Sequence, residues 1–111
     1  MSNIINNIDY KKVISLKNLI SIKDDSISTL SFVDRDNLIM KSLSADKGKE
    51  IPTHSSIGDV LVTVIDGVVE ITIDNEKFEL SVGESILIPM KTQHSLKALE
   101  SFKVFVIQVI S

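Results

Sequence analysis

Residues 48–67 read GKEIPTHSSIGDVLVTVIDG, and residues 83–98 read GESILIPMKTQHSLKA. The first stretch contains the apolar run 60–66 and ends at Gly67, while the second contains the shorter run 85–89. Short runs that are rich in β-branched residues and bounded by glycine and proline are typical of strands joined by tight turns. The two stretches therefore predict β-strands at the centre of an all-β fold.

Similar runs continue on both sides of these stretches. Residues 34–37 are Asx-rich and predict a tight turn, and the pair Asp74–Asn75 predicts another. Residues 45–52 are polar and predict a loop that leads into an extended segment through His54. Seven or eight short strands with almost no helix predict a sandwich or a barrel. Strands are expected at residues 26–33, 38–44, 60–66, 68–73, 77–80, 85–89 and 101–110.

The segment before the first strand has a different pattern. Val13, Leu16, Leu19 and Ile20 are spaced as on one face of a helix, and Ser15 is a candidate N-cap. This spacing predicts a short N-terminal helical segment. We expect residues 1–25 to pack on a β-barrel formed by residues 26–111.

Composition limits the functions that the chain can perform. Its 111 residues suit one domain, and apolar residues make up 43% and charged residues 24% of them, as in globular proteins. The net charge of −3 and the scattered lysines give no basic stripe, which disfavours a nucleic-acid partner. The chain has no cysteine, no helix-turn-helix pattern, no apolar stretch long enough to span a membrane, and no signal-peptide core in residues 1–12. A soluble, cytoplasmic protein is expected.

The strand at residues 60–66 is apolar on both faces. Val60, Val62 and Val64 lie on one side, while Leu61 and Ile65 lie on the other. A small barrel on its own leaves one face of each strand in water, so burial of both faces predicts that a second subunit covers part of the outside. We expect a homodimer; the alternative is that the N-terminal segment covers this face within one chain.

The first quoted stretch resembles the first motif of the cupin superfamily. Gly48 is followed after five residues by His54, and the stretch ends at Gly67, as in that motif. The motif has a second histidine and a glutamate, and this sequence has Ser56 and Val60 at those positions.

The second stretch resembles the second cupin motif. Gly83, Pro89 and His94 stand at its positions, whereas Lys91 replaces the usual glycine and Ala98 the usual asparagine. The resemblance implies a single-domain cupin, a jelly-roll β-barrel of the RmlC-like kind. It further implies that the motif side chains point into the barrel, where the complete family set of three histidines and one glutamate holds a divalent metal.

In this chain the metal-binding set is degenerate. Iron, manganese or zinc usually needs at least three imidazole or carboxylate ligands, and the motif positions supply only His54 and His94. Asp59 could become a further ligand only if Gly58 formed a bulge that turned it inward, because strand alternation sends it to the opposite face from Val60. No resident cofactor is expected; a weakly bound divalent transition metal on the two histidines is the alternative.

The expected ligand-binding residues are His54, Ser56, Met90, His94 and Gln108. His54 and His94 are the only histidines, and both occupy motif positions. Gln108 is in phase with apolar residues of the last strand, and Met90 lies in the loop after the motif strand. We expect a cupin without established catalysis that binds a small anionic or carbonyl-bearing molecule in its cavity.

Three alternatives stay open. One is a metal-dependent oxygenase or isomerase, and another is a metal-free enzyme like the sugar epimerases of the superfamily, with His54 or His94 as the general base. The third is a sensory module that acts through a partner protein. Fold resemblance alone cannot choose among them, because one barrel hosts many unrelated activities.

Overall fold

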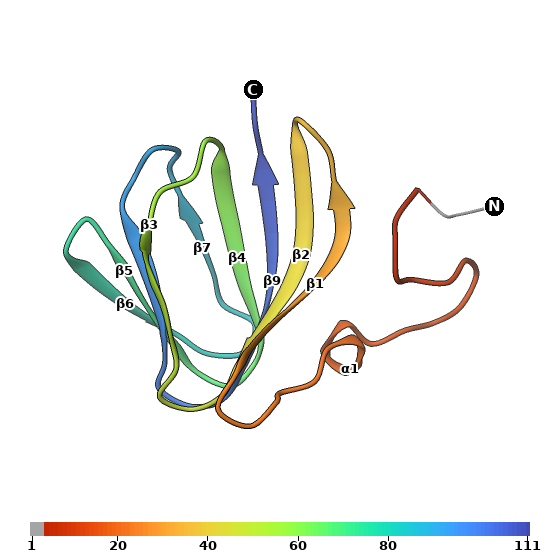
Figure 1. The fold of residues 1–111 in the computed structure, drawn as a ribbon, viewed down its shortest axis with the longest axis horizontal. Helices are drawn as coiled ribbons and strands as arrows, with labels where there is room; N and C mark the ends of the chain where they lie inside the picture. The colour runs from red at the N-terminus through yellow and green to blue at the C-terminus, as the bar shows by residue number, and fades with distance from the viewer. Residues whose placement is uncertain (1–3) are drawn as a thin grey trace.

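The structure, a computed structural model, describes residues 4–111, so residues 1–3 of the expected N-terminal segment lie outside the described residues. Within residues 4–111, one short helix precedes nine strands (Figure 1). The elements are α1 (Leu16–Leu19), β1 (Ile27–Asp34), β2 (Leu38–Ala45), β3 (Glu50–His54), β4 (Asp59–Asp66), β5 (Val69–Ile73), β6 (Glu76–Leu80), β7 (Ser85–Ile88), β8 (His94–Ala98) and β9 (Phe102–Val109).

The strands form two antiparallel sheets that face each other. One sheet has the order β1-β2-β9-β4-β7 and the other has the order β3-β8-β5-β6. In Figure 1 the two sheets approach each other at one end of the molecule and diverge at the other. The chain crosses repeatedly from one sheet to the other, which is the jelly-roll arrangement, so the prediction of an all-β jelly roll is confirmed.

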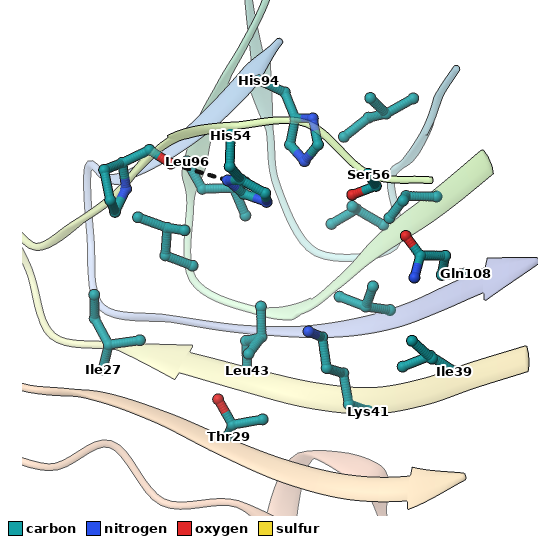
Figure 2. A pocket seen from close by; sticks show the side chains of 16 residues that line it. Ile27, Thr29, Ile39, Lys41, Leu43, His54, Ser56, His94, Leu96 and Gln108 are labelled. Atoms are coloured by element: carbon teal, nitrogen blue, oxygen red, sulfur yellow. Dashed lines mark hydrogen bonds between the residues drawn. The ribbon is translucent and has the colours of Figure 1, made fainter. Parts of the chain in front are cut away.

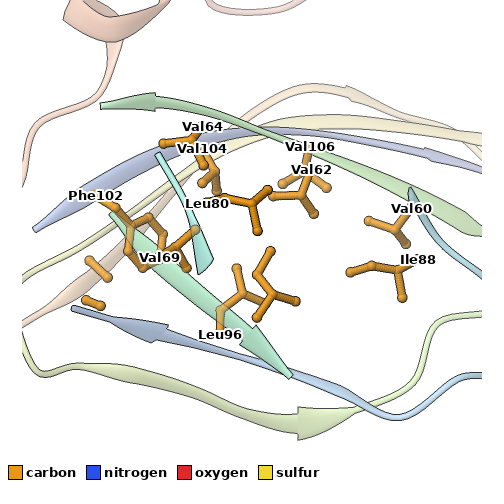
Figure 3. Packing of buried hydrophobic residues seen from close by; sticks show 13 residues of the cluster. Val60, Val62, Val64, Val69, Leu80, Ile88, Leu96, Phe102, Val104 and Val106 are labelled. Carbon is orange, nitrogen blue, oxygen red and sulfur yellow. The ribbon is translucent and has the colours of Figure 1, made fainter. Parts of the chain in front are cut away.

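The core lies between the sheets, where strand alternation turns one face of each strand inward. Val62 and Val64 on β4 meet Val104 on β9 from the same sheet, and Val69 and Leu96 reach them from the other sheet (Figure 3). All five are at most 4% exposed. Burial of each such side chain stabilises the fold by about 1.5–3 kcal/mol, so this cluster holds the two sheets together.

The outer face of the five-stranded sheet is partly covered by the N-terminal segment. The residues before α1 run beside β1 in Figure 1, and α1 itself contacts β4. The backbone N–H of Asn6 donates to the carbonyl of Phe32 at 2.8 Å, and the Ser44 hydroxyl donates to the carbonyl of Ser21 at 2.7 Å. Ile20 is 6% exposed and Phe32 is fully buried. The chain thus covers part of this face by itself.

Further along the same face, apolar side chains stay accessible. Leu61, Leu87 and Val109 on β4, β7 and β9 are among the exposed large hydrophobic residues. This apolar surface is not covered by the described part of the chain, so a second subunit could pack on it. The homodimer stays a prediction.

α1 is the short helix that the spacing of apolar residues predicted. Ser15 occupies the N-cap position and its carbonyl accepts from the backbone N–H of Asn18 at 3.0 Å, but its hydroxyl caps no helical N–H group. α1 is therefore one turn held mainly by the packing of its flanks. Within residues 4–111, no helix is long and apolar enough to cross a membrane.

Two details differ from the expected strands. β3 begins at Glu50, inside the predicted loop, and contains Pro52. This is tolerated because β3 is the edge strand of its sheet, where a missing N–H donor leaves no partner unsatisfied. β8 was not among the strands predicted from the sequence. It has only five residues, of which His94, Leu96 and Ala98 point inward, and so short an alternation does not distinguish a strand from a loop.

The turn between β4 and β5 requires glycine, and this gives a stability prediction. Gly67 and Gly48 both have positive φ, 77° and 85°, where alanine is strained by about 1–2 kcal/mol. A Cβ on Gly67 would also overlap the backbone carbonyl of Ser101, whereas one on Gly48 would meet nothing within 4 Å. We expect Gly67→Ala to lower the free energy of unfolding by at least ~2 kcal/mol more than Gly48→Ala, measured by urea denaturation. Equal losses would contradict the close packing of this turn.

Candidate functional site

The pairing of β3 with β8 brings the two histidines together. His54 is the last residue of β3 and His94 the first of β8, and the two are direct partners across the strands. Their ring centroids are 4.2 Å apart, with 60° between the ring planes. In Figure 2 both rings point from these segments toward the opposite sheet. The expectation that both imidazoles face one enclosed space agrees with this geometry.

Backbone carbonyls set the orientation of both rings. The Nδ1 of His54 lies 2.9 Å from the carbonyl oxygen of Pro52, and the Nδ1 of His94 lies 3.0 Å from that of Thr92. Because a carbonyl can only accept, each Nδ1 carries the proton and donates. In its neutral form each ring therefore keeps an unprotonated Nε2 that can accept a hydrogen bond.

The two rings differ in their exposure to water. His54 is exposed, whereas His94 is 3% exposed. Burial lowers the pKa of the His94 imidazole, the hydrogen bond to Thr92 raises it, and the nearby His54 lowers it again, with a net decrease. His94 is therefore neutral at pH 7 and presents an acceptor nitrogen deep in the site.

A cavity of about 270 Å³ lies between the sheets beside the histidines (Figure 2). It is close to the lower end of the ~300–1,000 Å³ range of small-molecule pockets. Most of its lining is aliphatic, with a few polar groups on both walls. Its lining residues are Ile27, Thr29, Ile39, Lys41, Leu43, Ile51, Pro52, His54, Ser56, Val60, Val62, Ile88, His94, Leu96, Val106 and Gln108.

The cavity brings together most of the residues that the sequence suggested. His54, Ser56, His94 and Gln108 all line it. Met90 does not: its side chain is 47% exposed in the loop before β8. Whether these residues bind a ligand stays a prediction.

The loop after β7 holds the rim of the site in place. The Asp59 carboxylate accepts the backbone N–H of Met90 at 2.9 Å, and the carbonyl of Ser56 accepts the N–H of Lys91 at 2.7 Å. Lys91 stands where the motif usually has glycine and adopts a φ of 58°, a conformation that glycine takes without strain. Asp59 is exposed, and its carboxylate binds the backbone of this loop. It does not turn into the cavity as a metal ligand.

One charged residue of the cavity, Lys41, was not among the candidate site residues predicted from the sequence. Lys41 lies in the middle of β2, and in Figure 2 its side chain extends from that strand into the space below the histidines. The sequence signal that could have identified Lys41 is strand alternation. Ile39 and Leu43 lie two positions before and after Lys41, and all three side chains line the cavity.

The donor set does not fit a firmly held metal ion. Among the described residues of the lining, only His54 and His94 carry an imidazole or a carboxylate, and the side-chain oxygen donors are the neutral groups of Thr29, Ser56 and Gln108. Across residues 4–111, no group of three or more His, Cys, Asp or Glu side chains is arranged to hold a metal. A divalent transition metal needs at least three such ligands, so we assign no chemistry to a metal here.

Comparison with known proteins identifies the family. A family model described as a cupin domain matches residues 43–109. The chain belongs to the cupin family. This cupin is 38% identical to a conserved protein of unknown function from Streptococcus pyogenes, with a TM-score of 0.95 over 98% of this chain and 96% of that one. The predicted small single-domain cupin is confirmed.

Two further solved structures resemble this cupin. A cupin 2 conserved barrel domain protein from Leptotrichia buccalis is 31% identical, with a TM-score of 0.84 over 86% of this chain and 47% of that one. A cupin superfamily protein from Desulfitobacterium hafniense is 20% identical and shares the fold, with a TM-score of 0.92 over 96% and 98% of the two chains. No curated protein matches the sequence.

The lowered pKa of His94 predicts how the stability of this cupin depends on pH. The imidazole of the unfolded chain has the ordinary pKa of about 6.5, so the unfolded state takes up the proton first as the pH falls. The contribution of His94 is therefore fully present above pH ~6.5 and is lost as the pH falls through that value toward the folded pKa. Urea denaturation between pH 8 and pH 5 measures this decline.

His94→Gln is the test variant and His54→Gln the matched control. We expect His94→Gln to flatten the decline and His54→Gln to keep most of it, because burial of His94 is the main cause of its shift. The hydrogen-bonded carboxylates Asp46 and Glu84 also have lowered pKa values. Their contributions to stability are lost only as the pH falls below their ordinary pKa values of 3.8 and 4.5, outside the range of this measurement. The same decline in the parent and in His94→Gln would contradict the buried, neutral imidazole.

Proposed function

We propose that this cupin binds a small molecule in the cavity between its sheets and does not transform it. The observation that carries the proposal is the pair of imidazoles, 4.2 Å apart and lining one largely aliphatic cavity. An enclosed apolar space with a few fixed polar groups is the usual form of a ligand site. The aliphatic walls would contact the body of the ligand and the polar groups would orient it.

The imidazoles would act as hydrogen-bond acceptors in this role. Both Nδ1 atoms are occupied by backbone carbonyls, so the Nε2 atoms are available to a hydroxyl or an N–H group of the ligand. Ser56 and Gln108 line the same cavity and can each donate or accept. Since the ring orientations are fixed before binding, little conformational entropy would be lost when the ligand enters.

Catalysis is the less favoured alternative. Cupins include both enzymes and proteins without known activity, so membership does not decide the question. A histidine that acts as a general base is usually oriented by a carboxylate, and no Asp or Glu lines this cavity. Among residues 4–111, no three ligand groups are arranged to hold a metal, so the metal-dependent alternative lacks a complete ligand set.

A fragment screen by NMR on the ¹⁵N-labelled protein tests the proposal. Fragments that bind should shift amide signals of the cavity lining, and His54→Gln and His94→Gln should each weaken the best one by about 2- to 13-fold, since a hydrogen bond contributes roughly 0.5–1.5 kcal/mol. Ser95→Ala is the matched control, because Ser95 follows His94 on β8 but does not line the cavity. A screen without cavity binders, or binders that are indifferent to both histidine variants, would overturn the proposal.

Metal analysis separates binding from metal-dependent catalysis. We expect protein purified without a histidine tag to contain iron, manganese, nickel and zinc well below one equivalent, because two imidazoles hold such ions weakly. Near-stoichiometric metal that is lost in the His54→Gln, His94→Gln double variant would favour the enzyme alternative instead.

A further inference from the structure

Among the described residues, Lys41 is the only Lys, Arg, Asp or Glu in the lining of the cavity. It sits in the middle of β2, opposite Val106 of β9, so its backbone is held by pairing on the β9 side and on the β1 side. Its neighbours in phase, Ile39 and Leu43, face the same cavity. The aliphatic stem of Lys41 lies among these apolar side chains. Figure 2 shows the side chain extending from β2 into the space below the histidines.

In the part of the chain that the structure describes, no carboxylate forms an ion pair with this ammonium group. The ion pairs within residues 4–111 use Lys12, Lys49 and Lys77, and Lys41 is in none of them. It also makes no side-chain hydrogen bond with another described residue. The Lys41 ammonium group is therefore available to pair with an anionic group of a ligand.

Gln108 lies within reach of the same ligand. It pairs with Ile39 across β2 and β9, two residues along from the pair of Lys41 with Val106. Diagonal neighbours of this kind have Cα atoms about 7–8 Å apart, close enough for two long side chains to contact one small group. The β2–β9 wall therefore offers an ammonium group and an amide N–H donor, which together suit a carboxylate.

The opposite wall has the reverse polarity. His54 and His94 belong to β3 and β8, and in their neutral forms they present only acceptor nitrogens to the cavity. A carboxylate also only accepts, so it gains nothing from a neutral imidazole. A hydroxyl group, in contrast, can donate to either Nε2.

We propose that the cavity selects small hydroxycarboxylates, with the carboxylate on Lys41 and Gln108 and the hydroxyl on the two imidazoles. The aliphatic residues between the walls would contact the carbon chain of the ligand. This inference rests on the proposed binding function and adds the class of ligand and its orientation.

The test uses ω-hydroxycarboxylates from 4-hydroxybutyrate to 8-hydroxyoctanoate as probes. For each chain length, the plain carboxylate lacks the hydroxyl and the ω-hydroxyamide lacks the charge. Titration followed by ¹⁵N amide shifts should give the tightest binding for a hydroxycarboxylate, with its shifts on cavity residues. A panel in which the hydroxyamides bind as tightly as the hydroxycarboxylates would overturn the inference.

Variants of Lys41 test whether its ammonium group binds the carboxylate of the ligand. Lys41→Met keeps much of the stem volume and should weaken the best hydroxycarboxylate by about tenfold or more, as expected for a charge-assisted hydrogen bond, while leaving the hydroxyamide unchanged. Lys41→Arg should retain the preference for the carboxylate. Lys97→Met is the matched control, because Lys97 is exposed on β8 and does not line the cavity. Amide spectra and urea denaturation show whether each variant is folded.

The outcomes distinguish this inference from the proposed function. If neutral fragments bind in the cavity and depend on the histidines, but Lys41→Met does not change carboxylate binding, the inference fails and the proposed function stands. If no compound of either kind shifts the cavity signals, both fail. Carboxylate binding that Lys97→Met weakens as much as Lys41→Met would show general attraction to surface charge and would also overturn the inference.

Discussion

The pairing of β3 with β8 is the constraint on which the site depends. These two strands place His54 directly opposite His94, although their register shifts between Ile51 and His54, the part of β3 that contains Pro52. Each ring then donates to the carbonyl two residues before it in its own chain segment. The orientation of the imidazoles is thus fixed by local backbone geometry and needs no ligand or metal to maintain it.

The rest of the fold supports this pair from the opposite sheet. The buried valines of β4 and β9 hold the sheets together, and three of them, Val60, Val62 and Val106, also line the cavity beside the histidines. Because the outer face near β1 is packed against the N-terminal segment, β2 and β9 form a firm wall facing the rings. The result is a cavity with acceptors on one wall and a cation on the other, which is an unsymmetrical environment suited to an unsymmetrical ligand.

Much of this arrangement could be predicted from the sequence. The alternation of apolar residues and the turn residues located most of the strands, and the motif spacing placed His54, Ser56 and His94 correctly in one cavity. Gln108 followed from its phase in the last strand. These features depend on local periodicity, which the sequence displays directly.

Other features depend on tertiary context. Lysine is usually exposed, so the residue type gave no reason to place Lys41 in the cavity, and only the packing of the second sheet over β2 shows that it faces inward. Met90 was placed near the cavity because it follows a motif strand, but Asp59 binds its backbone N–H in a loop that leaves the Met90 side chain 47% exposed. The direction of a loop side chain is set by such long-range contacts, and periodicity does not encode them.

The tautomer of the two imidazoles tests the central claim most directly. Long-range ¹H–¹⁵N correlation spectra above pH 7 report which ring nitrogen carries the proton, and the chain has only two histidines to assign. The account predicts that both rings are protonated at Nδ1, with unprotonated Nε2 atoms and with nuclear Overhauser effects between the two rings. Protonation of either ring at Nε2, or the absence of contacts between the rings, would contradict it.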